Sequence, residues 1–358
     1  MPEYWKNRYE ELTRFILQHP EVHIREKLVQ IPKDMRSEFY RLFDSVRITY
    51  LREIFPNFIR DSAMLVKEYI QVEQEVINLL ELKSISAPYT VSAFLHNPAE
   101  ELVRGLFHIL FDLLQAKIDL QIFENKASQE IKSSYNKLSQ SGYEKWITLS
   151  LIKLLQADKL FQVNLRPFSS SELWKKGRRS REEVPVPKVS KRLVFNSYSL
   201  DNTFTIPDVI IHSAAMNKYI ALGLEIGGSS AVASNASEKR DWYPVDSTSL
   251  TGIGLTLVYL ADKPEDISLI ADAERVCRPD LIIGCTVKEG SYLKEGFEKI
   301  NYYHSRLNPR LGTYMVSRDP MLNRSLREDI HVLNVGFKQQ NLEYIINVLS
   351  RQMEQVLI

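Results

Sequence analysis

Two acidic residues, Asp208 and Glu225, each lie within a run of apolar residues. Asp208 belongs to the run 206–211 and Glu225 to the run 219–227, with a short polar segment between them. Two such runs joined by a turn predict a β-hairpin that buries much of both strands. A buried carboxylate without a partner costs several kcal/mol, so it is normally protonated, paired or bound to a metal ion. The hairpin is therefore the first candidate for a functional site.

Carboxylates on adjacent strands suit the hydrolysis of a phosphodiester bond. This reaction needs neutralisation of charge on the oxygens bound to phosphorus, and a hydroxide formed near neutral pH. One or two divalent cations held by carboxylates supply both. The elements that must position Asp208 and Glu225 are a predicted helix at 144–158, a strand at 161–165 and the two hairpin strands.

This order of elements resembles the core of the PD-(D/E)xK nuclease superfamily, which includes many restriction endonucleases and repair nucleases. The resemblance covers roughly residues 142–316 and depends on a helix with Glu144, a strand with Pro207-Asp208 and a strand with Glu225. It implies a restriction-endonuclease-like fold, which is a mixed α/β sheet flanked by helices. It also implies that Asp208 and Glu225 bind Mg2+ or Mn2+, and that Glu144 assists directly or through a water molecule.

The chain departs from the family pattern at one position. The family has a lysine two residues after the second acid, where it helps to activate the attacking water, and this chain has Gly227 there. Either a cation from elsewhere takes this role, or the domain is an inactive nuclease-like module that binds DNA or protein. The candidate cations are Lys218, Lys239, Arg240 and Lys288.

The resemblance implies cleavage of double-stranded DNA, as by a restriction or antiviral defence endonuclease, and a homodimer would allow both strands to be cut. A polar, basic segment at 169–192 is predicted to be a mobile surface loop. Such a run either contacts DNA phosphates or is simply a solvated charged surface. The residues that would contact phosphate are Lys175, Lys176, Arg178, Arg179 and Arg181.

A second function also has some support in the sequence. The strand ending in Glu225 continues into Gly227-Gly228, which is similar to the cofactor loop of S-adenosylmethionine-dependent methyltransferases. Asp262, after the next apolar run, would then bind the ribose. The third glycine of that loop is missing, and two strands precede the motif where that fold usually begins with it, so the nuclease interpretation is preferred.

Other reactive residue types are expected to have structural roles. Asp280 follows a second proline and is predicted to cap a turn, because a threonine stands where a second acid would be needed. His212 and His304 are predicted to be hydrogen-bonded structural residues. The two cysteines, Cys277 and Cys285, have no metal-like spacing and are predicted to be small core residues.

Length and composition favour two domains. The chain has 358 residues, of which 44% are hydrophobic, and a net charge of +1, which excludes a protein that is basic over its whole surface. Residues 1–137 are predicted to form a helical domain of five or six helices, interrupted at five prolines. With no apolar signal core and no run of about 20 apolar residues, we expect a cytoplasmic protein without a membrane segment.

The remaining residues, 138–358, are predicted to form the nuclease-like α/β domain. Its first strands follow one another without helices, whereas later strands alternate with helices, so the sheet should begin antiparallel and become parallel. Helices are predicted at 267–276, 292–307 and 340–353. The predicted strands are 193–198, 206–211, 219–226, 255–260, 281–285, 313–316 and 330–335.

Overall fold

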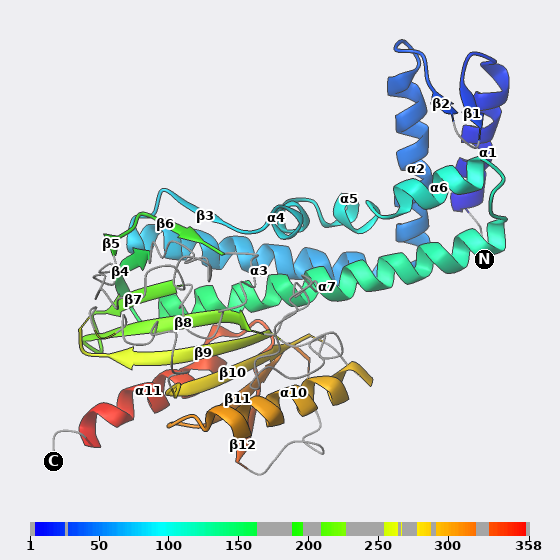
Figure 1. Cartoon of the computed structure of the whole chain (residues 1–358). Coiled ribbons are helices and arrows are strands. Elements are labelled where there is room, and N and C mark those ends of the chain that lie inside the picture. Colours follow the sequence, from blue (N-terminus) through cyan, green and yellow to red (C-terminus); the bar gives the residue numbers. More distant parts are fainter. Residues whose placement is uncertain are drawn as a thin grey trace, which may run out of the picture. The chain divides into compact units, whose positions relative to one another are not determined.

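The chain forms two compact units in the computed structural model (Figure 1). Unit 1 comprises residues 1–67 and 89–139, and unit 2 comprises residues 68–88 and 140–358. Two helices, α3 (Pro56–Leu80) and α7 (Leu120–Leu154), contribute residues to both units. The structure describes residues 4–25, 28–162, 188–195, 209–226, 254–263, 266, 278–287, 291–319 and 329–355.

Unit 1 is built from helices, as its sequence predicts. Of the five prolines predicted to interrupt helices, Pro20, Pro32 and Pro88 lie between elements, and Pro56 and Pro98 are the first residues of helices. Both places fit the rule that proline disfavours helix in the residue before it. A small antiparallel ladder that the sequence did not indicate, β1 with β2, joins the first two helices. Besides parts of α3 and α7, the elements are α1 (Tyr4–Gln18), β1 (His23–Arg25), β2 (Leu28–Gln30), α2 (Arg36–Ile54), α4 (Tyr89–His96), α5 (Pro98–Leu102) and α6 (Leu106–Leu114).

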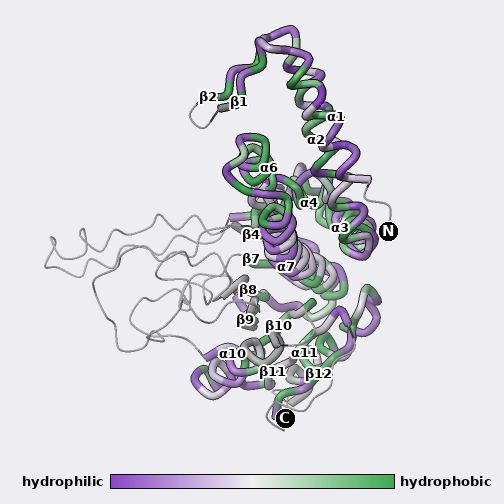
Figure 2. Tube along the Cα trace, turned by 90° about the vertical axis from the view of Figure 1, so that its right-hand side faces the viewer, coloured by the Kyte–Doolittle hydropathy of each residue, from purple (hydrophilic) through white to green (hydrophobic). Residues whose placement is uncertain are grey.

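Aromatic side chains form much of the core of unit 1. Trp5 of α1 packs against Tyr50 of α2 and Phe123 of α7, with ring centroids 5.2 and 5.4 Å away. Phe43 and Phe111 pack with centroids 4.7 Å apart. Figure 2 shows α6 as largely hydrophobic, whereas α1 and α2 alternate between hydrophobic and hydrophilic residues along their length. This alternation is typical of amphipathic helices that bury one face.

Helix α7 starts earlier than the sequence indicates. The predicted start of this helix at residue 144 is wrong, because the helix begins at Leu120 and passes through Gly142 without a break. A glycine in a helix costs about 1 kcal/mol relative to alanine. Tyr143 and Trp146, on the same stretch, are fully buried, and their burial outweighs that cost.

Unit 2 contains an eight-stranded mixed sheet with the order β12-β11-β10-β9-β8-β7-β4-β5. Every neighbouring pair from β5 to β10 is antiparallel, and β10, β11 and β12 are parallel, so the predicted change of direction is confirmed. Parallel strands require a crossover, and α10 (Ser291–Leu307) supplies the one between β10 and β11. The strands are β4 (Ala157–Gln162), β5 (Lys188–Val189), β7 (Val209–Ser213), β8 (Lys218–Ile226), β9 (Gly254–Ala261), β10 (Leu281–Thr286), β11 (Thr313–Ser317) and β12 (Ile330–Asn334).

Helices cover both faces of this sheet (Figures 1 and 2). Phe297, Ile300 and Tyr303 of α10 share one core cluster with side chains from seven strands. On the other face, Tyr344 of α11 (Glu343–Gln355) packs on Tyr314 of β11, with ring centroids 5.8 Å apart. A short helix, η1 (Gln339–Leu342), precedes α11, and a two-stranded sheet joins β3 (Ser84–Ser86) to β6 (Arg192–Val194).

The mixed α/β architecture and the helical N-terminal region are thus present as expected. Cys285 is buried and free, as predicted for a core residue, whereas Cys277 lies outside the described residues. The helix predicted at 267–276 and the loop at 169–192 also lie largely outside them.

Candidate functional site

The predicted hairpin is present as β7 and β8. Val209 pairs with Leu222 and Ser213 pairs with Lys218, and residues 214–217 form the turn. Asp208 itself lies outside the described residues, but the residue after it, Val209, pairs with a residue three positions before Glu225. The register therefore brings the start of β7 beside the end of β8 that carries Glu225.

The end of β8 is irregular. Gly223 pairs with Leu257 of β9 and Ile226 pairs with Leu255, so the register shifts between these positions, and Glu225 falls within the shift. Irregularities of this kind are common next to active sites, where they redirect a side chain. The structure describes the backbone of Glu225 but not its side chain.

Glu144 reaches the same end of the sheet from α7. Its Oε1 atom accepts the backbone N–H of Gly254, the first residue of β9, at 2.8 Å. The same oxygen accepts the side-chain amide of Gln140, one turn earlier in α7, at 2.6 Å. A Cβ atom at position 254 would lie 2.2 Å from Oε1 of Glu144, so any larger residue there would push the carboxylate of Glu144 away. Leu255, the residue after Gly254, pairs with Ile226, the residue after Glu225. Glu144, which binds Gly254, therefore lies at the end of the sheet that carries Glu225.

A buried lysine on α10 interacts electrostatically with Glu144. Lys299 is only 1% exposed. Burial lowers the pKa of its ammonium group to about 8, although the charge of Glu144 acts in the opposite direction. The next residue, Ile300, packs where Gly284 of β10 leaves room, and a Cβ at Gly284 would lie 2.7 Å from it. The close approach of α10 to the sheet thus carries Lys299 into the interior.

Lys299 was not among the cations that the sequence suggested. The helical spacing does indicate that Lys299 is buried. Position 299 comes three residues after Gly296 and four before Tyr303, so all three lie on the buried face of the helix. A lysine at such a position is usually read as one that extends its stem and keeps its charge in water. In this structure the whole side chain is buried.

A second buried lysine, Lys145, directly follows Glu144. Its ammonium group donates to Ser141 Oγ at 2.9 Å and lies 5.6 Å from the ring centroid of Phe195. Lys145 is also 1% exposed. Burial of a charged amine is costly without polar partners, and Ser141 supplies one to Lys145.

Of the four cations proposed from the sequence, Lys218 can be placed and is excluded. It pairs with Asp262 at the start of β8, seven residues from Glu225, which at about 3.3 Å per residue is roughly 23 Å. The other three, Lys239, Arg240 and Lys288, lie outside the described residues. So do the predicted phosphate contacts Lys175, Lys176, Arg178, Arg179 and Arg181.

The residues predicted to be structural have structural contacts. Asp280 is buried, and its carboxylate accepts the backbone N–H of Leu260 at 2.7 Å and contacts Arg310 at 3.3 Å. His212 contacts Asp158 at 2.6 Å. His304 contacts Thr313 Oγ1 and Asp329 Oδ2, each at 2.8 Å. The predictions for His212 and His304 are confirmed. Asp280 is structural, but its carboxylate binds strand β9 and Arg310 instead of capping a turn as predicted.

Cys285 contributes no nucleophile. Its thiol is fully buried, and burial raises the pKa of the thiol well above its usual value, with the charge of Glu144 acting in the same direction. The thiolate is the reactive form of cysteine, so a raised pKa makes this side chain inert at neutral pH. Cys285 contributes to the site through its backbone carbonyl oxygen, which accepts a hydrogen bond from Gln140.

Carboxylates are the ligands that Mg2+ and Mn2+ prefer, so Asp208, Glu225 and Glu144 form a suitable donor set. Among the described side chains, no group of three or more His, Cys, Asp and Glu residues is arranged to hold a metal ion. The side chains of Asp208 and Glu225 are outside that set. Within the described part of the chain, every helix is too short or too polar to cross a membrane.

The chain matches no protein-family model, no curated protein sequence and no solved structure.

Proposed function

We propose that unit 2 is a metal-dependent nuclease that hydrolyses phosphodiester bonds in DNA. The observation that carries this proposal is the interaction of Glu144 with the buried Lys299 at the end of the sheet to which Glu225 belongs. A carboxylate and an amine in a buried setting provide the metal ligand and the proton-transfer group that this hydrolysis requires. Helix α7 precedes three strands that are neighbours in the sheet, β4, β7 and β8, and this arrangement supports the resemblance to restriction endonucleases.

Asp208, Glu225 and Glu144 would hold Mg2+ or Mn2+, which supplies charge neutralisation and lowers the pKa of a bound water. The protein's own contribution is to orient the ligands. Glu144 is held by two N–H donors and by the rigid helix that carries it. Ligands fixed in this way need no rearrangement when the substrate binds.

Lys299 would replace the lysine that the family has two residues after the second acid. An ordinary lysine has a pKa near 10.4 and is almost entirely protonated at neutral pH. With its pKa lowered to about 8, Lys299 can accept a proton from water near neutral pH and return it to the leaving oxygen. The glycine at position 227 is then compatible with an active enzyme.

The finer features of the proposal concern the substrate. The segment with Lys175, Lys176, Arg178, Arg179 and Arg181 would hold DNA phosphates, contacts that position DNA without reading its sequence. A homodimer would place two sites on a duplex and allow both strands to be cut, as in restriction and antiviral defence.

The methyltransferase alternative has less support. Its cofactor would bind at the carboxyl ends of parallel strands, whereas β8 and β9 are antiparallel. Asp262, the residue expected to bind the ribose, instead pairs with Lys218 and is 71% exposed.

The test is cleavage of plasmid DNA with Mg2+, with Mn2+ and with a chelator. Asp208→Asn and Glu225→Gln should each abolish metal-dependent cleavage, because each replaces a charged ligand of the cation with a neutral amide of the same size. Asp262→Asn is the matched control, since it removes an acid at the opposite end of β8 and should leave the rate unchanged. Full activity in both site variants would refute the proposal, and binding of DNA without turnover would favour the inactive module.

A further inference from the structure

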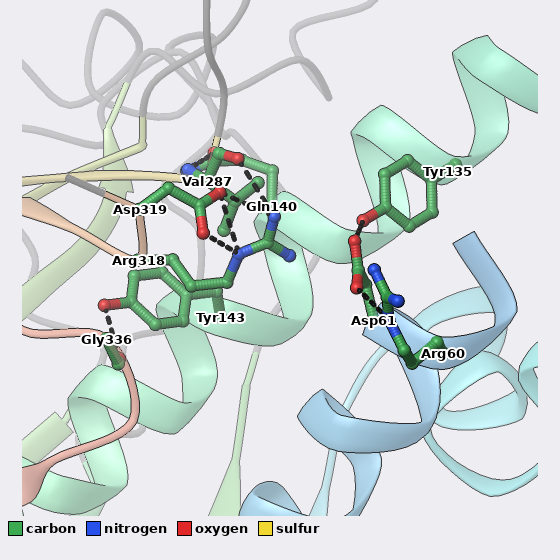
Figure 3. Close-up of polar contacts among 9 residues, drawn as sticks. All are labelled: Arg60, Asp61, Tyr135, Gln140, Tyr143, Val287, Arg318, Asp319 and Gly336. Carbon is green, nitrogen blue, oxygen red and sulfur yellow. Dashed lines mark hydrogen bonds and ion pairs between the residues drawn. The ribbon is translucent and has the colours of Figure 1, made fainter. Parts of the chain in front are cut away.

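The side chain of Gln140 makes three hydrogen bonds with three separate partners. Its Nε2 atom donates to the carbonyl oxygen of Cys285 at 2.7 Å and to Glu144 Oε1 at 2.6 Å. Its Oε1 atom accepts the backbone N–H of Val287 at 3.1 Å. Figure 3 shows the amide beside Val287, whose carbonyl oxygen also accepts Nη2 of Arg318 at 3.4 Å.

The partners determine the orientation of the amide. The carbonyl of Cys285 can only accept and the N–H of Val287 can only donate, so nitrogen must face the first and oxygen the second. Both hydrogens of Nε2 are therefore used, one on Cys285 and one on Glu144. A rotated amide would lose all three bonds, so the buried Gln140 has one stable arrangement.

Gln140 and Glu144 are four residues apart on α7 and therefore lie on the same helix face. The carboxylate of Glu144 is thus held between two donors that the sheet and the helix supply, Gly254 N–H and the amide of Gln140. The same amide extends the pattern of main-chain hydrogen bonds at the carboxyl end of β10. Gln140 thus links that strand end to Glu144 directly, in addition to the link through Gly254, which pairs with Cys285.

We propose that Gln140 is a positioning residue, which fixes the carboxylate of Glu144 for metal-dependent hydrolysis and couples it to the carboxyl end of β10. This inference rests on the proposed function of unit 2. Gln140 itself touches neither metal nor substrate in this scheme, and it acts only through Glu144.

The test is a double-mutant cycle on the initial rate of DNA cleavage. Gln140→Met keeps the length of the side chain and removes its three hydrogen bonds, so the rate should fall by about tenfold or more, because a small misplacement of a catalytic group is costly. In a Glu144→Gln background, the same substitution should change the remaining rate by less than about twofold, because its route of action is already lost. Single-turnover assays at high enzyme concentration make the slow variants measurable.

Tyr143→Phe is the matched control. Its hydroxyl donates to the carbonyl oxygen of Gly336 at 2.9 Å, so the variant also removes a bond between α7 and the rest of unit 2, without touching Glu144. Its effect on the rate should be below about twofold in both backgrounds, while both variants lower Tm by a few degrees. A merely structural Gln140 would behave as Tyr143 does.

If Gln140→Met does not fold, Gln140→Asn keeps the neutral amide but withdraws it by one methylene group, which breaks or weakens the same hydrogen bonds. Equal fold-losses in the wild-type and Glu144→Gln backgrounds would overturn the inference while leaving the proposed function intact. A wild-type protein that cleaves no DNA with any divalent metal would overturn the proposed function, and this inference with it.

Discussion

The two ends of β9 are each anchored by a carboxylate, and they differ in the cation that accompanies it. At one end, Asp280 accepts the N–H of Leu260 and pairs with Arg310, whose side chain is 54% exposed. At the other end, Glu144 accepts the N–H of Gly254 and interacts with the buried Lys299. The backbone contact is the same at both ends. Only the second combines it with an amine whose pKa burial lowers, so only the second is suited to proton transfer.

The difference between the two ends of β9 is tested most directly by replacing Lys299 and Arg310, one at a time, with methionine, an apolar residue of similar length. Lys299→Met should lower the rate of DNA cleavage by about 10²- to 10⁴-fold, the usual contribution of a proton-transfer group. Arg310→Met should leave the rate within about twofold, because its guanidinium group is more than half exposed and lies at the other end of β9. Initial rates at saturating Mg2+ measure both. Equal losses in the two variants would remove the distinction between the ends.

The buried amine should also be visible in the pH dependence of folding. Lys299 has a pKa of about 8 in the folded chain and near 10.5 when exposed, so between these pH values the unfolded state binds more protons and stability rises with pH. Below pH 8 both states are protonated, and the folded state bears the full cost of the buried charge. Lys299→Met should therefore stabilise the protein at pH 7 by up to about 3 kcal/mol, a gain that disappears toward pH 10.5.

Urea unfolding at several pH values measures the difference in unfolding free energy between Lys299→Met and the wild type. Arg310→Met is the control, and its difference from the wild type should not change with pH in this way. A Lys299→Met protein that is less stable than the wild type at pH 7 would show that the attraction to Glu144 exceeds the cost of burial.

Asp280 should matter for stability and not for cleavage. Asp280→Ala leaves the N–H of Leu260 without its acceptor, which costs about 1–3 kcal/mol of unfolding free energy. Because this end of β9 is the one without a buried amine, the rate per folded molecule should be unchanged. Thermal unfolding measures the loss of stability, and a cleavage assay well below Tm measures the rate. A lower rate in fully folded Asp280→Ala protein would contradict a purely structural role for Asp280.

Much of the sheet could be predicted from local sequence patterns. The apolar, β-branched runs around Val209, Ile220 and Ile283 became β7, β8 and β10, because such runs are buried on both faces of a covered sheet. The change from antiparallel to parallel followed from where helices intervene. These features depend on neighbours in the sequence, which is why they could be read from it.

The site depended on contacts that sequence spacing does not encode. Glu144 and Gly254 are 110 residues apart, and nothing local to either predicts their hydrogen bond. Lys299 was not singled out in the sequence, and its burial depends on the close approach of α10 to Gly284, a residue of another element. The start of α7 was misplaced because tertiary packing of Tyr143 and Trp146 overrides the low helix propensity of Gly142.

The burial of Cys285 offers a way to time the opening of this end of the sheet. Its sulfur sits in the strand end that Gln140 contacts, so an alkylating reagent can reach it only in molecules where that end has transiently separated. When closing is fast, the observed labelling rate is the reaction rate of an exposed thiol multiplied by the fraction of open molecules. Thiol labelling followed by mass spectrometry can thus measure how often this end of the sheet opens locally, in the free protein and without any substrate.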